Sequence, residues 1–112
     1  MKKKKKRGPQ LPAKIPDVKD TIKLSLQSGR YLYMVHAKDK AREREITRPE
    51  AEYVLLNGRR EPRKDEFKTK HKDWNYAMRG WDVDGEKELR VCVAFAAQGM
   101  LIITAIDLNL DT

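Results

Sequence analysis

Residues 89–106, LRVCVAFAAQGMLIITAI, contain the strongest structural signal in this chain. The first half alternates between apolar and other residues, as a half-buried strand does. Its apolar face holds Leu89, Val91, Val93 and Phe95, and its other face holds Arg90 and Cys92. The second half, MLIITAI, is apolar on both faces, which is typical of a central strand. With Ala97-Gln98-Gly99 as the turn, the stretch predicts an antiparallel hairpin.

Further strand signals precede this hairpin. WNYAMRGW (74–81) alternates loosely, and Asp84-Gly85 in the segment that follows is a strong turn signal. The alternating acidic residues Asp82, Asp84 and Glu86 lack the remaining ligands of a calcium loop, so we assign them to the turn. REPRKDEFKTKHKD (60–73) is polar and is interpreted as an irregular or edge strand leading to a loop. Together these segments predict an antiparallel sheet of about three to four strands.

The segment before the sheet has helical patterns. DVKDTIKLSLQSG (17–29) predicts a first helix that Asp17 or Asp20 caps, and HAKDKAREREI (36–46) predicts a second helix, with YLYMV (31–35) as a connector. TRPEAEYVLLNG (47–58) carries a Thr47/Glu50 capping-box pattern and ends at Gly58. Helices followed by strands predict an α+β fold, with the N-terminal helices packed on one face of a C-terminal antiparallel sheet.

The positive charge is concentrated at the N-terminus. Of the net charge of +8, residues 1–19 carry +7, because eight basic groups face Asp17 alone. We therefore predict a basic disordered tail over 1–16 and a single α+β domain over 17–112. Such a tail either binds nucleic acid or another anionic surface, or it is a solubilising segment without a partner. One cysteine and no long apolar window predict a cytoplasmic protein that does not cross a membrane.

Most familiar catalytic chemistry lacks its residues here. His36, His71 and Cys92 do not have zinc-site spacing, and there is no dinucleotide- or phosphate-binding glycine loop. We expect no metal and no cofactor. The remaining histidines, lysines, arginines and tyrosines suit a metal-free ribonuclease, since RNA supplies its own 2′-OH nucleophile and the protein adds only acid–base groups and cations.

A family resemblance is found in one spaced motif: His36-Ala37, then Lys40, Arg44 and Ile46. VLLNG, WNYAMRG, ELRVCVAF and MLIITAI follow it in order. Over residues 17–108 the chain resembles small bacterial proteins of unassigned function related to RelE-type and MqsR-type toxins, which are mRNA interferases with a compact α+β fold. Lys40 stands where that family usually has arginine, so it keeps the charge but lacks the planar fork.

The resemblance implies a toxin that cleaves single-stranded mRNA, free or on the ribosome, without metal. His36 would transfer protons, Tyr76 would stack or transfer protons, and Lys40, Arg44 and Arg79 would hold phosphate. It also implies a small antitoxin partner, with a zinc-binding form as one expectation.

Alternative interpretations stay open for each of these residues. His36 could cap its helix, Lys40 and Arg44 could form a solvated face, Tyr76 could be a core aromatic, and Arg79 could face water. His71, in a charged loop, is interpreted as incidental. The protein itself could instead be a non-catalytic nucleic-acid-binding module that uses its tail, or a structural protein completed by a partner chain.

Overall fold

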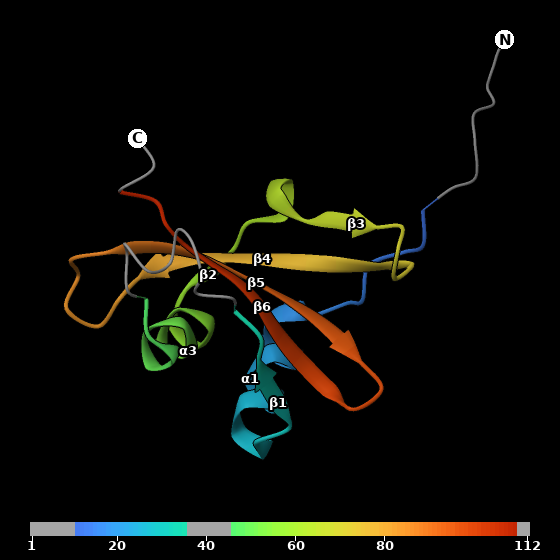
Figure 1. The fold of residues 1–112 in the computed structure, drawn as a ribbon, viewed down its shortest axis with the longest axis horizontal. Helices are drawn as coiled ribbons and strands as arrows, with labels where there is room; N and C mark the ends of the chain where they lie inside the picture. Colours follow the sequence, from blue (N-terminus) through green and yellow to red (C-terminus); the bar gives the residue numbers. More distant parts are fainter. Residues whose placement is uncertain (1–10, 36–45, 110–112) are drawn as a thin grey trace, which may run out of the picture.

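A computed structural model describes residues 11–35 and 46–109 of the chain (Figure 1). In this part the elements are α1 (Val18–Ser28), β1 (Tyr31–Tyr33), α3 (Arg48–Asn57), β2 (Arg59–Arg60), the 3-10 helix η1 (Pro62–Lys64), β3 (Glu66–Lys68), β4 (Asp73–Trp81), β5 (Glu88–Ala96) and β6 (Gly99–Asp107). Both α-helices lie on the same side of the sheet (Figure 1). The predicted α+β class, with helices on one face of a sheet, is therefore confirmed. None of the described helices is long and apolar enough to cross a bilayer.

The sheet is larger than predicted. Its strand order is β1-β6-β5-β4-β2, with β3 also paired to β4, which makes six strands in the described part rather than three to four. The antiparallel meander β4-β5-β6 is as expected. However, the predicted connector YLYMV contains β1, which pairs in parallel with β6 from Tyr31↔Met100 to Tyr33↔Ile102. The purely antiparallel prediction is therefore wrong at this edge, because a three-residue strand that pairs with the far end of the chain leaves no local signal.

The central hairpins separate at one end of the sheet. The last pair between β4 and β5 at this end is Tyr76↔Val93, so residues 73–75 and 94–96 are not paired with each other. At the same level β5 and β6 have a bulge, since Cys92 pairs with Thr104 while Val93 pairs with Ile102. A bulge bends its strand and increases the twist. The β3–β4 and β5–β6 hairpins consequently diverge beyond this point, as Figure 1 shows.

The two helices begin differently. In α3 the capping box is confirmed, because the Glu50 amide donates to Thr47 Oγ1 at 3.2 Å and the Thr47 amide donates to Glu50 Oε1 at 2.8 Å. Asp17 stands at the N-cap of α1, but its side chain makes no cap hydrogen bond and its backbone is left-handed with φ 49°. Asp17 is therefore not the predicted cap, whereas Asp20 lies in the first turn, where a carboxylate interacts favourably with the helix dipole.

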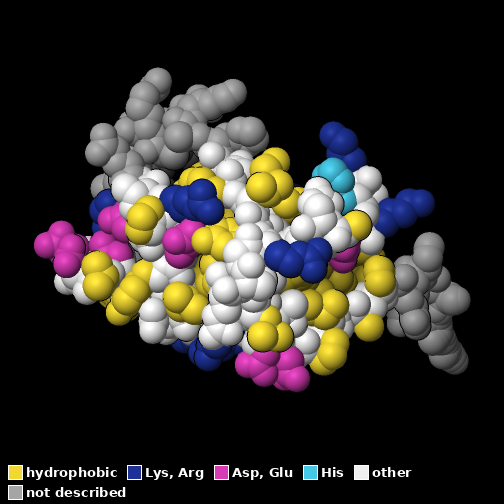
Figure 2. Space-filling view, turned by 90° about the horizontal axis from the view of Figure 1, so that it is seen from below, with side chains coloured by type: hydrophobic (Ala, Val, Ile, Leu, Met, Phe, Trp, Pro, Cys, Tyr) yellow, Lys and Arg dark blue, Asp and Glu magenta, His cyan; other side chains and the backbone are white. Residues whose placement is uncertain are grey.

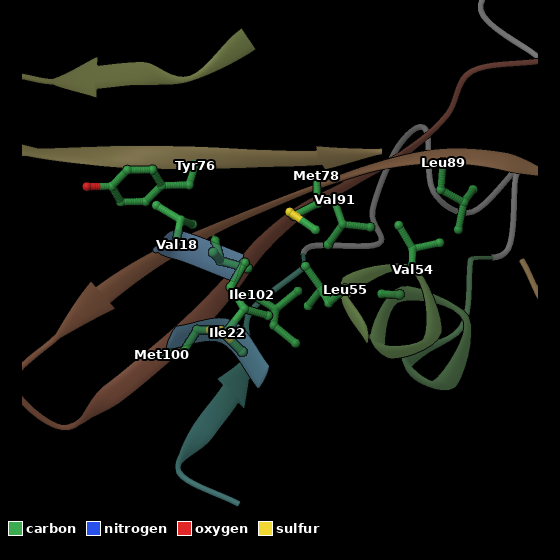
Figure 3. Packing of buried hydrophobic residues seen from close by; sticks show 12 residues of the cluster. Val18, Ile22, Val54, Leu55, Tyr76, Met78, Leu89, Val91, Met100 and Ile102 are labelled. Atoms are coloured by element: carbon green, nitrogen blue, oxygen red, sulfur yellow. The ribbon is translucent and has the colours of Figure 1, made fainter. Parts of the chain in front are cut away.

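The core lies between the helices and the central strands (Figure 3). Its buried side chains come from α1, α3, β4, β5 and β6. The largest of them are Tyr76, Ile22, Leu55, Met78, Leu89, Met100 and Ile102. Val35 and Ile46, which flank residues 36–45, also pack against this cluster.

Residues 11–16, here called the N-terminal strap, contact the sheet. Trp74 Nε1 donates to the Pro12 carbonyl at 2.9 Å, and the Ile15 amide donates to the Tyr76 hydroxyl at 3.0 Å. Lys14 Nζ lies 2.8 Å from Asp65 Oδ2 and 4.6 Å from the centroid of the Trp74 ring. These six residues belong to the tail predicted to be disordered, but Pro12 and Ile15 have specific partners on β4, and Lys14 has partners in Asp65 and Trp74.

Candidate nucleic-acid interface

The motif that suggested a ribonuclease lies mainly outside the described residues. His36, Lys40 and Arg44 belong to residues 36–45, so their roles and the predicted helix over 36–46 stay predictions. What the structure places is the two ends of this segment. Val35 and Ile46 both pack on the core, and Val35 follows Met34, whose amide donates to the Ile102 carbonyl at 2.7 Å.

Tyr76 lies in the core. Its side chain is 2% exposed, and its ring centroid is 5.8 Å from that of Phe95 and 5.6 Å from the Arg60 guanidinium carbon. The phenol oxygen accepts the Ile15 amide of the N-terminal strap. In this arrangement Tyr76 is packed as a core aromatic, and its hydroxyl has a structural partner.

Arg79 points to the opposite face of the sheet from Tyr76, since the two are three residues apart on one strand. Its guanidinium binds Glu88 in a bidentate manner, at 2.9 and 3.2 Å, and Glu61 at 3.1 Å. The hydrogen bonds that Arg79 donates to Glu88, and then those to Glu61, raise its pKa further above its already high ordinary value. The structure therefore does not bring Tyr76 and Arg79 into one site, contrary to the grouping that the sequence predicted.

Arg79 belongs to a small ion-pair network. Arg90 binds Glu61 at 2.7 and 3.1 Å, and the more exposed Arg59 lies 3.9 Å from Glu88. The arginine hydrogen bonds lower the pKa of both Glu61 and Glu88, so the two carboxylates stay charged and neutralise much of this cationic cluster. The network links β2, β4 and β5, and binding a phosphate at Arg79 would require displacing Glu88 and Glu61.

Cys92 does not have the environment of a nucleophile. Burial raises the pKa of its thiol to about 11, so the thiolate is scarce at neutral pH. Cys92 is half-buried and alternates along β5 with the core residues Val91 and Val93, so it lies on the other face of the strand. No group of three or more histidine, cysteine, aspartate or glutamate side chains that could hold a metal occurs within residues 11–35 and 46–109.

A groove of about 630 Å³ opens where the two hairpins diverge. We call it the sheet groove. It is lined by Phe67, Lys68, Thr69, Lys70, His71, Asp73, Asn75, Ala94, Phe95, Ala96, Leu101 and Ile103. Asn75, Ala94 and Leu101 alternate with core residues along their strands, so they lie on the face away from the helices. The groove thus follows from the loss of β4–β5 pairing beyond Tyr76.

The sheet groove combines an apolar floor with a basic rim. Phe67, Leu101 and Ile103 supply apolar surface, while the rim consists of Lys68 at the end of β3 and of Lys70 and His71 from the β3–β4 turn. Lys68 is partly engaged by Glu66 at 2.8 Å. In Figure 2 dark-blue lysine or arginine side chains lie near the cyan histidine at one end of the molecule. A cationic groove with aromatic or apolar contact surface is the arrangement that single-stranded nucleic acid uses.

Sequence reasoning missed this site. It interpreted His71 as incidental in a charged loop, although KTKHKD places three lysines and a histidine in and beside the loop that follows the predicted edge strand. The usable signal was the aromatic Phe67 immediately before that loop. What could not be seen in the sequence is that β5 and β6 diverge from β4 beside it, because this separation depends on pairing between distant strands.

Comparison with known proteins places the chain in a family. Residues 33–107, which are 75 of the 112 residues, match the family described as "Domain of unknown function (DUF4258)", and the chain belongs to it. No curated protein and no solved structure matches it significantly. The matched region includes the His36-to-Ile46 motif and the sheet groove, but not the lysine-rich tail.

Proposed function

We propose that this member of a family of unknown function binds single-stranded RNA and cleaves it without a metal ion, as the toxin of a bacterial toxin–antitoxin pair. The observation that carries the RNA assignment is the sheet groove. Its volume of about 630 Å³ is in the range of small-ligand sites, and it pairs apolar surface with lysines. Bases can stack on such a floor while the rim attracts phosphates.

The family match supports a role in the domain rather than in the tail alone. It spans 33–107 and therefore contains the candidate proton-transfer and phosphate-binding residues, whereas Lys2 to Arg7 lie outside it. A function that belongs to the family therefore does not require the tail. This favours a domain-based activity over the alternative in which the tail does all of the nucleic-acid binding.

The proposed chemistry uses the RNA 2′-OH as the nucleophile. A base removes its proton, the oxygen attacks the adjacent phosphorus, and the 5′-oxygen leaves with a proton from an acid. His36 is the proposed proton-transfer group, with Lys40 and Arg44 stabilising the phosphate charge. The chain has one other histidine, His71, which lines the sheet groove, so the two imidazoles are separate candidates for the same step.

The proposed setting is the bacterial cytoplasm, where mRNA is available. A small antitoxin would then mask the RNA-binding surface, and the resemblance to RelE-type and MqsR-type toxins suggests one with or without a zinc-binding domain. A non-catalytic RNA-binding module is a second candidate, and the same groove favours it, because a stacking floor and a basic rim need no proton-transfer group.

The test is cleavage of a single-stranded RNA by the purified chain in EDTA, compared with His36→Ala and His71→Ala. The proposal expects activity that survives EDTA and falls by about 10²–10⁴-fold in His36→Ala. An equal loss in His71→Ala alone would move the chemistry to the sheet groove. Tight RNA binding without cleavage in the unaltered chain would reject the enzyme and leave the binding module.

A further inference from the structure

We propose that the surface on which the N-terminal strap lies is a recognition site for a proline-rich segment that carries a lysine. The strap occupies this site as a tethered ligand, and a segment of the same chemistry from a partner protein displaces it. We call the site, which consists of Asp65, Trp74 and Tyr76, the strap site. This inference goes beyond the proposed ribonuclease and does not depend on it.

The strap lies on the domain in the way that a bound peptide does. All six of its residues, 11–16, are exposed, and the first core residue that follows them is Val18. They form neither helix nor strand. Figure 1 shows the strap, in blue, beside the end of β4 that leads into the β3–β4 turn. It is held there by two backbone groups and one lysine, those of Pro12, Ile15 and Lys14.

The backbone contacts are those that aromatic surfaces make with proline-rich peptides. The indole nitrogen of Trp74 donates to the Pro12 carbonyl at 2.9 Å, and the Tyr76 hydroxyl accepts the Ile15 amide at 3.0 Å. The strap sequence LPAKIP contains two prolines. Each proline fixes its own φ and disfavours helix in the residue before it, which favours an extended backbone. Such segments dock on aromatic-lined surfaces and lose little conformational entropy when they bind.

Lys14 gives the site a requirement for positive charge. Its Nζ lies 2.8 Å from Asp65 Oδ2 and 4.6 Å from the centroid of the Trp74 ring. The Asp65 side chain is fully buried, and its carboxylate is already held by Arg60 and by the Ala77 amide. The carboxylate is therefore fixed by the domain, independently of the strap. A ligand lysine forms a charge-assisted hydrogen bond with it that a glutamate in the same place cannot form.

Two observations indicate that the strap is a replaceable occupant. The strap site lies within residues 33–107, which the family match covers, whereas the strap lies outside this region. The strap also joins α1 through Asp17, whose φ of 49° is left-handed and thus less favourable for a residue with a Cβ. An untethered segment makes the same contacts without that strain. It can therefore compete with the strap, although the tether gives the strap an effective concentration in roughly the millimolar range.

The experiment uses the full chain, and nuclear magnetic resonance follows the indole N–H signals of Trp74 and Trp81. The probes are a synthetic LPAKIP peptide with blocked ends and the same peptide with glutamate in place of its lysine. A release variant, Lys14→Glu with Ile15→Pro, disrupts the ion pair and removes the amide donor at two exposed positions. Lys23→Glu on α1 is the matched control, because it makes the same charge change at an exposed position outside the strap.

The Trp74 indole signal should shift in the release variant, because the Pro12 carbonyl no longer accepts its proton. Adding LPAKIP should return the signal toward its position in the unaltered chain. The release variant should bind this peptide several-fold more tightly than the unaltered chain does, since the strap no longer competes. The glutamate peptide should bind at least about 10-fold more weakly. Lys23→Glu should behave like the unaltered chain.

The contrary results are distinct. LPAKIP that leaves the Trp74 signal of the release variant unmoved at roughly millimolar concentration, or that binds no better than the glutamate peptide, would overturn the proposal. Unfolding of the release variant would do the same, because the strap would then be an integral part of the fold.

Two other occupants would also overturn it. A single-stranded 2′-O-methyl RNA that moves the Trp74 signal while the peptide does not would assign the surface to nucleic acid. A dimer of the unaltered chain that the release variant loses would assign it to strap exchange between copies. None of these measurements involves RNA cleavage, so the ribonuclease and the strap site are refuted by different results.

Discussion

Removing the carboxylate of Asp65 should be among the most damaging single changes in this domain. Asp65 follows η1, and its side chain is fully buried. Its carboxylate accepts hydrogen bonds from both terminal nitrogens of Arg60, at 3.0 and 2.6 Å, and from the Ala77 amide at 2.8 Å. Lys14 of the N-terminal strap adds an ion pair at 2.8 Å. One side chain therefore holds the strap, the β2–β3 connection and β4 together.

Asp65→Ala should lower the free energy of unfolding by about 3–5 kcal/mol, because it leaves the Arg60 guanidinium partly buried without its counter-charge. This is a large share of the roughly 5–15 kcal/mol that a domain possesses. Glu66→Ala is the matched control, since it removes the neighbouring carboxylate, which is exposed and forms an ion pair with the exposed Lys68. An exposed pair contributes about 0–1 kcal/mol.

Urea unfolding followed by circular dichroism measures both variants. The pH dependence gives a second check. Burial alone would raise the pKa of Asp65, but Arg60, Lys14 and the Ala77 amide together lower it below its ordinary value. The stabilisation is therefore present above the unfolded pKa of about 3.9 and is lost as pH falls through the folded value. A cost for Asp65→Ala no larger than that for Glu66→Ala would refute this account of the buried cluster.

Three further predictions concern single side chains. Tyr76→Phe should lower the free energy of unfolding in urea by about 1 kcal/mol, because the Ile15 amide loses its acceptor. The rate of RNA cleavage should change less than about threefold, and a loss of about 10²-fold would show that the phenol takes part in the chemistry. At pH near 8, Cys92 should react with iodoacetamide at least about 10-fold more slowly in the folded chain than in urea, because burial raises the pKa of its thiol to about 11. Mass spectrometry measures both rates, and equal rates would contradict that environment. Gly58→Ala should lower the free energy of unfolding by about 1–3 kcal/mol, because a Cβ there would lie 2.5 Å from the Arg79 carbonyl oxygen; an unchanged midpoint would show that α3 can move away from β4.

The predictable parts of the fold are those with local signals. The Thr47/Glu50 capping box, the stop at Gly58 and the alternation along β5 are read within a few residues, and the structure has all three. Tyr31–Tyr33 was misread because its partner, Met100–Ile102, lies about seventy residues away. The strap was missed for the same reason. Its composition of prolines and lysines predicts disorder, but Ile15 and Pro12 bind side chains more than sixty positions along the chain.

In the candidate site, too, local signals could be predicted from the sequence and contacts between distant residues could not. Residue types alone indicated phosphate chemistry, but β-strand alternation places Tyr76 and Arg79 on opposite faces, and Glu88 and Glu61 already occupy the Arg79 guanidinium. Neither the carboxylate partners nor the divergence of the hairpins that forms the sheet groove is visible in the spacing of residues along the chain. His71 becomes a candidate only because the divergence of the hairpins opens the sheet groove that it lines.

The most direct measurement of the central claim is the chemical identity of the RNA ends. The purified chain is incubated in EDTA with a synthetic single-stranded RNA, and the fragments are weighed by mass spectrometry. Attack by the 2′-OH predicts a 2′,3′-cyclic phosphate on one fragment and a free 5′-hydroxyl on the other, and no cut at a position where a 2′-deoxy nucleotide replaces the ribonucleotide. Fragments ending in 3′-hydroxyl and 5′-phosphate, or intact RNA after prolonged incubation, would contradict the account.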